Sequence, residues 1–248
     1  MTCYEGLDAA ALARRWGVAL CEVYDQVTST LDVVHERGEG NAPASTTILA
    51  DEQVAGRGRH GRRWQSPAGR GVWLGYLMRP AEPAAVPLIS IRVGMAVAAA
   101  LEGLGAHVAL KWPNDLILAS RKLGGILCEA RWSGKHPAWV AVGVGLNVHG
   151  PMPDDLRDTA VAVDEICPGT DRLGVLDRVV PGLAGVPEAP QLADAELRAY
   201  AARDWLRGRR LREPVAGRAV GIDASGALLL ERRDGDIERI RGGSIVAA

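Results

Sequence analysis

Apolar and polar positions along the chain alternate in patterns that predict a sheet with few helices. Apolar runs that end in polar residues or in proline predict strands at 45–53 and 71–80. After Pro87, apolar residues at spacings of three and four predict an alanine-rich helix that ends near Gly103 and Gly105. Further strand-like runs lie at 107–112, 115–119, 122–132 and 138–148. The pattern therefore predicts a largely sheet-based domain of the α/β or α+β class that extends to about residue 148.

The second half of the chain has weaker patterns. Residues 150–190 are rich in proline, glycine and aspartate and predict at most one short helix, around 173–180. Residues 191–208 predict a better helix, with an apolar face and a glycine at its end. Beyond it, short apolar runs separated by the turn sequences DASG and RDGD predict a small antiparallel barrel. We therefore expect a main domain over 1–211 and a small domain over 212–248.

Composition and charge narrow the class of protein. The chain has 248 residues, of which 48% are hydrophobic, so it can bury a sizeable core. With 29 basic and 30 acidic residues it has no overall basic field that would attract nucleic acid or an anionic membrane. Its first residues do not resemble a secretory signal, and no run of about 18 uncharged apolar residues predicts a membrane span. The four cysteines are scattered, which favours reduced thiols in a cytoplasmic protein over a disulfide pair.

One segment concentrates positive charge. The sequence GRGRHGRRW, residues 56–64, places four arginines and a histidine in a loop between two predicted strands. Arginine presents a planar fork of donors that suits phosphate, and the glycines expose backbone N–H groups that add anion sites. The loop therefore favours an anionic ligand such as a nucleotide. Two other interpretations remain open on this segment alone: a solvated charged loop, and a glycine-arginine tail that binds RNA.

A second group of polar residues follows a strand break. In KWPNDLIL, residues 111–118, Pro113 interrupts the pattern, so that Asn114 and Asp115 can project into a cleft, although Asn-Asp after proline is also ordinary turn chemistry. In SRKLGGIL, Lys122 begins an apolar strand with two glycines behind it. That position makes Lys122 a candidate for a fixed cation, where an isolated lysine would be a solvated charge.

These motifs, in this order and spacing, resemble the characteristic sequences of biotin protein ligases. Supporting matches are TST at 28–30, Gln53, GVGLNV at 143–148 and GIDASGALLL at 221–230, so the resemblance covers nearly all of the chain from about residue 24. The resemblance implies an α+β fold: a mixed-sheet catalytic core similar to class II aminoacyl-tRNA synthetases and lipoate ligases, followed by a small SH3-like β-barrel. The implied barrel agrees with the domain division near Leu211.

The resemblance also implies a reaction and its site residues. Biotin and ATP give biotinyl-5′-AMP with Mg²⁺ present, and a lysine of a biotin carboxyl carrier protein then takes the biotinyl group. Lys122, Arg57 and Arg59 are the expected catalytic cations, since two anions must be brought together. Residues expected to bind biotin are Ser29, Thr30, Gln53, Arg57, Gly58, Arg59, Lys122, Gly124 and Gly125. Residues expected to bind the nucleotide are Arg59, Trp64, Lys111, Asn114, Asp115 and Asn147, with Asp115 also a candidate Mg²⁺ ligand.

Some features depart from the family or leave alternatives open. Leu31 stands where the family usually has asparagine, which removes one polar contact near biotin. Only about 23 residues precede Tyr24, too few for a winged helix, so we expect no DNA binding; residues 11–20 predict a short helix packed on the core. Trp64 is either a cover for adenine or biotin or an ordinary core residue. The remaining functional alternatives are a lipoate-type acyl-adenylate ligase and a non-catalytic nucleotide- or RNA-binding module, and the resemblance allows a homodimer.

Overall fold

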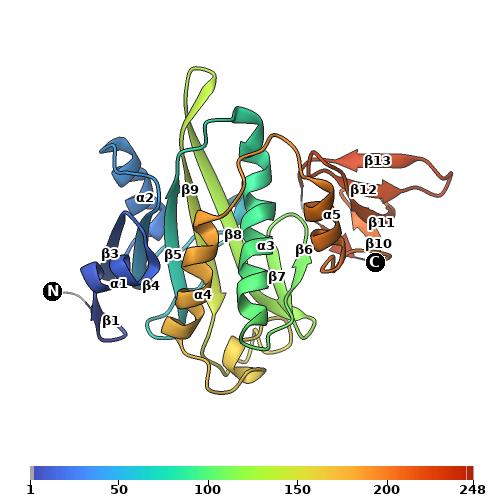
Figure 1. Ribbon diagram of the computed structural model, residues 1–248. Coiled ribbons are helices and arrows are strands. Elements are labelled where there is room, and N and C mark those ends of the chain that lie inside the picture. Colours follow the sequence, from blue (N-terminus) through green and yellow to red (C-terminus); the bar gives the residue numbers. More distant parts are fainter. Residues whose placement is uncertain (1–2, 244, 248) are drawn as a thin grey trace.

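A seven-stranded mixed sheet forms the centre of the protein. The computed structural model describes residues 3–243 and 245–247. Within this range the sheet has the order β3-β4-β5-β9-β8-β7-β6, and only β3 and β4 are parallel neighbours (Figure 1). Its strands are β3 Leu20–Val27, β4 Thr46–Gln53, β5 Gly71–Met78, β6 Ala109–Lys111, β7 Asp115–Leu118, β8 Arg121–Ser133 and β9 His136–Asn147. Every strand expected between 45 and 148 is confirmed.

Helices cover both faces of the sheet. Adjacent residues of a strand point to opposite faces, and Ile48 packs with α2 (Thr30–Glu39) whereas Leu49 belongs to the larger core on the other side. On that other side α3 (Ile89–Glu102) and α4 (Arg172–Ala184) lie side by side (Figure 1). The expected short N-terminal helix is confirmed as α1 (Ala9–Trp16), which follows the strands β1 (Cys3–Tyr4) and β2 (Leu7–Asp8). Neither β3 nor α2 was predicted from the sequence.

Two predicted helices have the wrong length. α4 continues to Ala184, past Pro181, because Val179, Val180 and Leu183 are all buried and its packing sustains the last turn. α5 covers only Asp194–Ala201 of the expected 191–208. The chain leaves the helix there and pairs with the edge strand β6: the Leu110 amide donates to the carbonyl of Arg203 at 2.7 Å, and the Trp205 amide donates to that of Leu110 at 3.0 Å.

The C-terminal residues form a separate antiparallel sheet of five strands in the order β13-β12-β11-β10-β14, beside α5 (Figure 1). The strands are β10 Arg210–Glu213, β11 Gly217–Ile222, β12 Leu228–Glu231, β13 Ile237–Ile240 and β14 Val246–Ala247. β10 pairs with β11 and β14, so this sheet begins at Arg210, two residues before the expected start at 212. The remaining elements are short 3₁₀ turns, η1 Arg59–Gly61, η2 Pro83–Leu88 and η3 Val163–Glu165.

The continuous helical stretch Pro83–Glu102 is long and apolar enough, by length and composition, to cross a membrane. However, 56% of its apolar 18-residue segment is buried inside the protein, where Ile89, Val93 and Leu101 contribute to the core. Its Arg92 is also buried and paired with Glu196 on α5 at 2.8 Å. The stretch therefore serves as the core helix under the sheet. Cys21, Cys128 and Cys167 are free thiols, as their spacing predicted.

Candidate active site

A cleft of about 910 Å³ collects the predicted site residues from three separate segments. Its walls come from the start of α2 and the end of β4, from the arginine loop at 56–64, from the strands β6 to β9, from the segment 149–160, and from Gly243, Ile245 and Val246. The predicted residues that line it are Ser29, Thr30, Gln53, Arg57, Gly58, Arg59, Trp64, Lys111, Asn114, Asp115, Lys122, Gly125 and Asn147. A site of this size and mixed polarity suits a small organic ligand together with a nucleotide.

Gly124 does not line this cleft. A Cβ at this position would lie 2.4 Å from the carbonyl oxygen of Gly145 on the neighbouring strand β9, so glycine is needed there for strand packing. Gly125, by contrast, faces Asp115 and Lys122 with ordinary van der Waals space. Of the two adjacent glycines, only Gly125 lies where a ligand can approach.

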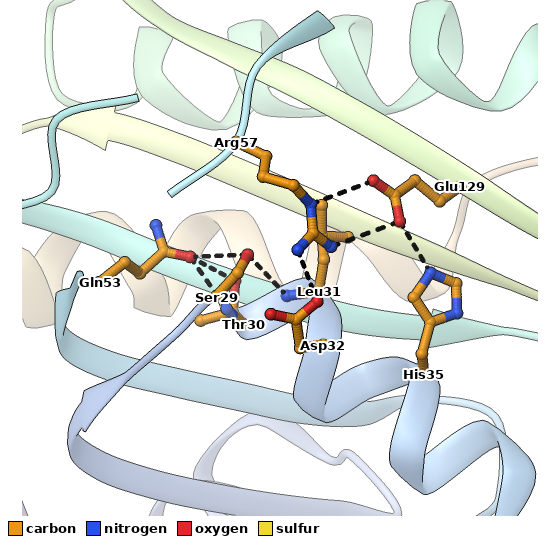
Figure 2. A network of polar contacts seen from close by, with 8 residues as sticks. All are labelled: Ser29, Thr30, Leu31, Asp32, His35, Gln53, Arg57 and Glu129. Atoms are coloured by element: carbon orange, nitrogen blue, oxygen red, sulfur yellow. Dashed lines mark hydrogen bonds and ion pairs between the residues drawn. The ribbon is translucent and has the colours of Figure 1, made fainter. Parts of the chain in front are cut away.

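Ser29, Thr30 and Gln53 form one hydrogen-bonded group at the start of α2 (Figure 2). The Gln53 side-chain oxygen accepts from the Thr30 amide at 2.9 Å, the Thr30 hydroxyl at 3.1 Å and the Ser29 hydroxyl at 3.4 Å. Its side-chain nitrogen donates to the hydroxyl of Ser66 at 2.8 Å. The Gln53 oxygen is therefore fully used inside the protein, which leaves one side-chain N–H as its free polar group.

Arg57 lies between two carboxylates (Figure 2). Its Nη1 donates to Asp32 of α2 at 2.5 Å, while its Nε and Nη2 each approach Glu129 of β8 at 3.4 Å. Burial alone would lower the pKa of Arg57, but its bonds to Asp32 and Glu129 raise it above the usual value. Arg57 is thus a permanently charged group that lines the cleft, while its partners Asp32 and Glu129 are not among the lining residues.

Arg59 of the arginine loop contacts Asn114 of the KWPNDLIL motif. The Arg59 Nη1 donates to the Asn114 side-chain oxygen at 3.4 Å, and the Asn114 side-chain nitrogen donates to the carbonyl of Ile126 at 3.0 Å. Burial lowers the pKa of Arg59. The arginine loop itself closes through backbone bonds, including one from the Gly58 amide to the Arg62 carbonyl at 2.7 Å. Its mobility before a ligand binds stays a prediction.

Lys122 pairs with Asp115 on the neighbouring strand, with 2.7 Å between Nζ and the carboxylate. The same Nζ lies 5.4 Å from the centre of the Trp64 ring, a distance at which the ring face attracts a cation. Trp64 in turn covers Gly145, where a Cβ would lie only 2.7 Å from the indole nitrogen. Trp64 therefore lies against the cleft floor, with its indole N–H buried and without a partner among the described residues.

The remaining predicted residues have partly structural contacts. Asn147 is only 8% exposed and donates to the carbonyl of Val161 at 3.3 Å. Lys111 points its Nζ at the ring of Trp205, 5.4 Å from the centroid. Leu31, at the position where the family has asparagine, is buried and packs against Gly143 of β9. An apolar contact with the sheet thus replaces the missing polar group.

Three residues next to the site were not predicted: Asp32, His35 and Glu129. The available signal was a charged residue inside an apolar strand-like run, since Glu129 follows ILC in the segment 122–132. His35 and Asp32 lie on α2, which the sequence pattern did not predict. Their contribution therefore becomes visible only when α2 and β8 are brought together.

Comparison with known proteins agrees with the motifs. The model of the biotin/lipoate A/B protein ligase family matches residues 23–147, and that of the biotin protein ligase C-terminal domain matches 207–246. The chain belongs to the biotin protein ligase family. The ligase is 32% identical over 227 residues to the bifunctional ligase/repressor BirA of Bacillus subtilis (strain 168), covering 86% of this chain and 69% of that protein. It is 38% identical over 212 residues to the biotin–[acetyl-CoA-carboxylase] ligase of Paracoccus denitrificans, covering 75% of this chain and 84% of that one.

Among solved structures, the ligase is similar to the biotin protein ligase from Aquifex aeolicus in complex with biotin and ATP. The TM-score is 0.74 at 27% sequence identity, and the match covers 92% of this chain and 98% of that one. These similarities confirm the expected α+β fold, with a mixed-sheet core followed by a small C-terminal barrel.

Proposed function

We propose that this ligase joins biotin to a carrier protein in two steps. The biotin carboxylate attacks the α-phosphorus of ATP, which releases pyrophosphate and forms biotinyl-5′-AMP. The ε-amine of a lysine on a biotin carboxyl carrier domain then attacks the carbonyl carbon, which forms an amide, releases AMP and returns one proton to solvent. The observation that carries this proposal is that Arg57 and Arg59 of the arginine loop and Lys122 of the SRKLGGIL motif line the same cleft.

The charges in the cleft suit the first step. A carboxylate and a triphosphate repel each other, so fixed cations must offset the repulsion and stabilise the charge that develops on phosphate. Arg57 bonds to Asp32 in the first turn of α2, where Ser29 and Thr30 also lie, so we assign it to the biotin carboxylate. Lys122 lies beside Gly125 and Trp64, where it would bridge the carboxylate and the α-phosphate. Arg59, the third catalytic cation, would close over the phosphates from the loop and exclude water from the mixed anhydride.

The other cleft residues are assigned to binding. Ser29, Thr30 and the free N–H of Gln53, together with the glycines of the loop, face the biotin ring system. Trp64, Asn114, Lys111 and Asn147, which all line the cleft, are assigned to the nucleotide. Gly124 is excluded from this group because its role lies in strand packing.

Magnesium fits this site as part of the substrate. No group of three His, Cys, Asp or Glu side chains suited to a metal gathers among the described residues, and the carboxylate of Asp115 is already paired with Lys122. Mg²⁺ usually keeps several water ligands and is bound by one or two carboxylates together with substrate phosphates. We therefore infer that Mg²⁺ enters with ATP, with Asp115 as its one carboxylate contact.

Cellular location, assembly and domain division belong to the same proposal. The free thiols fit a cytoplasmic location. β3 is an edge strand of the large sheet and offers an unpaired edge for a second copy, which would give the homodimer that the family resemblance allows. We place the division between catalytic and C-terminal units at the loop that precedes β10.

Pyrophosphate release tests the first step. Purified protein with MgATP is compared in the presence of biotin, lipoate, octanoate or no acid. Release with biotin alone is expected, followed by transfer of labelled biotin to a carrier domain and not to its lysine-to-arginine variant. Release with lipoate or octanoate would indicate the acyl-adenylate alternative, and release with no acid tested would contradict a ligase.

A further inference from the structure

A chain of polar contacts runs from the outer face of the sheet to Arg57. The indole N–H of Trp139, on β9, donates to the Nδ1 of His35 on α2 at 3.1 Å. An indole nitrogen only donates, so Nδ1 must be the acceptor, and neutral His35 carries its proton on Nε2. That Nε2 lies 2.9 Å from Glu129 and donates to its carboxylate. Glu129 in turn contacts Arg57.

The three residues that lead to Arg57, namely Trp139, His35 and Glu129, lie on strands and a helix. The His35 side chain is only 8% exposed, and that of Glu129 is 28% exposed. Trp139 packs so closely on α2 that a Cβ on Gly38 would lie 2.6 Å from its ring. Arg57, by contrast, belongs to a glycine-rich loop. The contacts therefore connect the Arg57 side chain to residues of two strands and a helix.

The charge state of Glu129 favours its contact with the guanidinium of Arg57. Burial by itself would raise the pKa of this carboxyl, but the hydrogen bond from His35 and the charge of Arg57 hold it below the usual value. Glu129 is thus ionised at neutral pH and attracts the guanidinium continuously. His35 contributes by holding the carboxylate in place and by satisfying one of its lone pairs.

The geometry at Arg57 distinguishes the two carboxylates. Glu129 faces the side edge of the guanidinium, formed by Nε and Nη2, whereas Asp32 contacts only Nη1 (Figure 2). A guanidinium binds a second carboxylate through its end edge, Nη1 and Nη2. The Asp32 side chain is 44% exposed, so water can solvate it when a substrate carboxylate takes its place. Glu129 can keep its contact while the end edge turns to the substrate.

We propose that Glu129, held by His35 and Trp139, is a positioning residue that fixes the side edge of Arg57 and leaves its end edge for the carboxylate of biotin. This role rests on the proposed function, because it presumes that biotin is the acid bound. It assigns no contact between Glu129 and the substrate. Its consequence is that biotin affinity depends on residues behind the cleft.

A double-mutant cycle tests the role. Glu129→Gln, Arg57→Ala and the double variant are compared with the parent by the KM for biotin in pyrophosphate exchange, and biotin binding without ATP is measured by calorimetry. Glu129→Gln should raise the KM and Kd for biotin about tenfold and change the KM for ATP by less than about twofold. In the Arg57→Ala background the same change should have no further effect. Glu36→Gln makes the same substitution on α2, next to His35, at a side chain that is 71% exposed; it is the matched control and should behave like the parent.

Two results would overturn the positioning role alone. One is an equal loss from Glu129→Gln with and without Arg57; the other is tighter biotin binding, which would make Glu129 a competitor of the substrate. A parent protein that does not bind biotin would overturn the proposed function itself, and this role with it. Should Glu129→Gln fail to fold, His35→Gln, which keeps a donor, should retain more biotin affinity than His35→Leu, and equal affinities would overturn the role.

Discussion

The indole Nε1 of Trp112 donates a hydrogen bond of 2.9 Å to the carbonyl oxygen of Gly226, 114 residues later in the chain. Trp112 is only 3% exposed. At Gly226, where φ is +77°, a Cβ would lie 2.7 Å from the side chain of Leu88, so only glycine permits this approach. The motif KWPND and the turn DASG of the C-terminal sheet are therefore joined in one buried contact.

Trp112→Phe should destabilise the protein by about 1–2 kcal/mol, because the buried carbonyl of Gly226 loses its donor while the aromatic packing is largely kept. Urea denaturation followed by circular dichroism measures the change. Trp132→Phe provides the control, since Trp132 is 51% exposed at the end of the β8–β9 hairpin and should leave the stability unchanged. Equal stability of Trp112→Phe and the parent would contradict the importance of this contact.

The sequence predicted those parts of the fold that depend on local pattern. Strands from β4 to β9 follow from apolar runs and their breaks, and α3 follows from its helical spacing. The early end of α5 could not be predicted, because the segment after Ala201 pairs with β6, a contact between residues about 90 positions apart. α2 was missed because the β-branched Thr30, Val33 and Val34 and the glycine Gly38 give a poor local helix signal, which packing on β4, β5 and β9 overrides.

The sequence likewise revealed some residues of the candidate site and not others. Two loops were visible from the sequence: 56–64 because four arginines are concentrated among glycines, and 111–115 because Pro113 interrupts an apolar run and is followed by two polar residues. Asp32, His35 and Glu129 were not visible, since each is an unremarkable residue until α2 and β8 bring it next to Arg57. Gly124 was assigned to the ligand because adjacent glycines do not reveal which one faces the neighbouring strand.

Lys122→Ala should reduce biotinyl-AMP formation by about a hundredfold or more while the protein stays folded, since it removes a cation from the reacting groups. The loss should appear in pyrophosphate exchange, with an unchanged circular dichroism spectrum. Lys135→Ala, in the exposed tip of the β8–β9 hairpin, makes the same substitution away from the cleft and should retain full exchange. Normal turnover by Lys122→Ala would remove Lys122 from the mechanism.

Arg59→Gly should let the adenylate escape, because the loop would lose its side-chain contact with Asn114 and its cover over the phosphates. Filter binding of labelled biotinyl-AMP, formed in place, gives the release rate, which should rise by at least about tenfold. Arg63→Gly changes the same loop but removes a side chain bonded to the carbonyl of Val54. As the control, Arg63→Gly should retain biotinyl-AMP longer than Arg59→Gly does. The proposal that Arg59 acts as a lid would be wrong if Arg59→Gly retained biotinyl-AMP as long as the parent does.

Asp32→Asn should bind biotin a few-fold more tightly than the parent, because Asp32 competes with the substrate carboxylate for the Nη1 of Arg57. Calorimetry without ATP measures the affinity. The variant also loses an acidic residue in the first turn of α2, which should cost about 0.5 kcal/mol of stability. Weaker biotin binding would show that Asp32 positions Arg57 and does not compete with the ligand.

Asp204→Asn should stabilise the protein at neutral pH. One carboxylate oxygen of Asp204 accepts from the Leu206 amide at 2.9 Å, but the other is buried without a partner among the described residues. Burial therefore raises the pKa of Asp204, against the opposing effect of backbone bonds from Leu206 and Arg207.

The sign of the pH dependence follows from the direction of that shift. The folded chain keeps a proton that the unfolded chain releases, so stability is lost as the pH rises from the ordinary aspartate pKa through the raised one, and the loss persists at pH 7. Asparagine cannot ionise and escapes this loss. The variant should be about 1 kcal/mol more stable than the parent at pH 7, with the difference shrinking as the pH falls towards about 4. Chemical denaturation at both pH values, with exposed Asp155→Asn as the control, measures it; a difference independent of pH would show that the buried charge is not its cause.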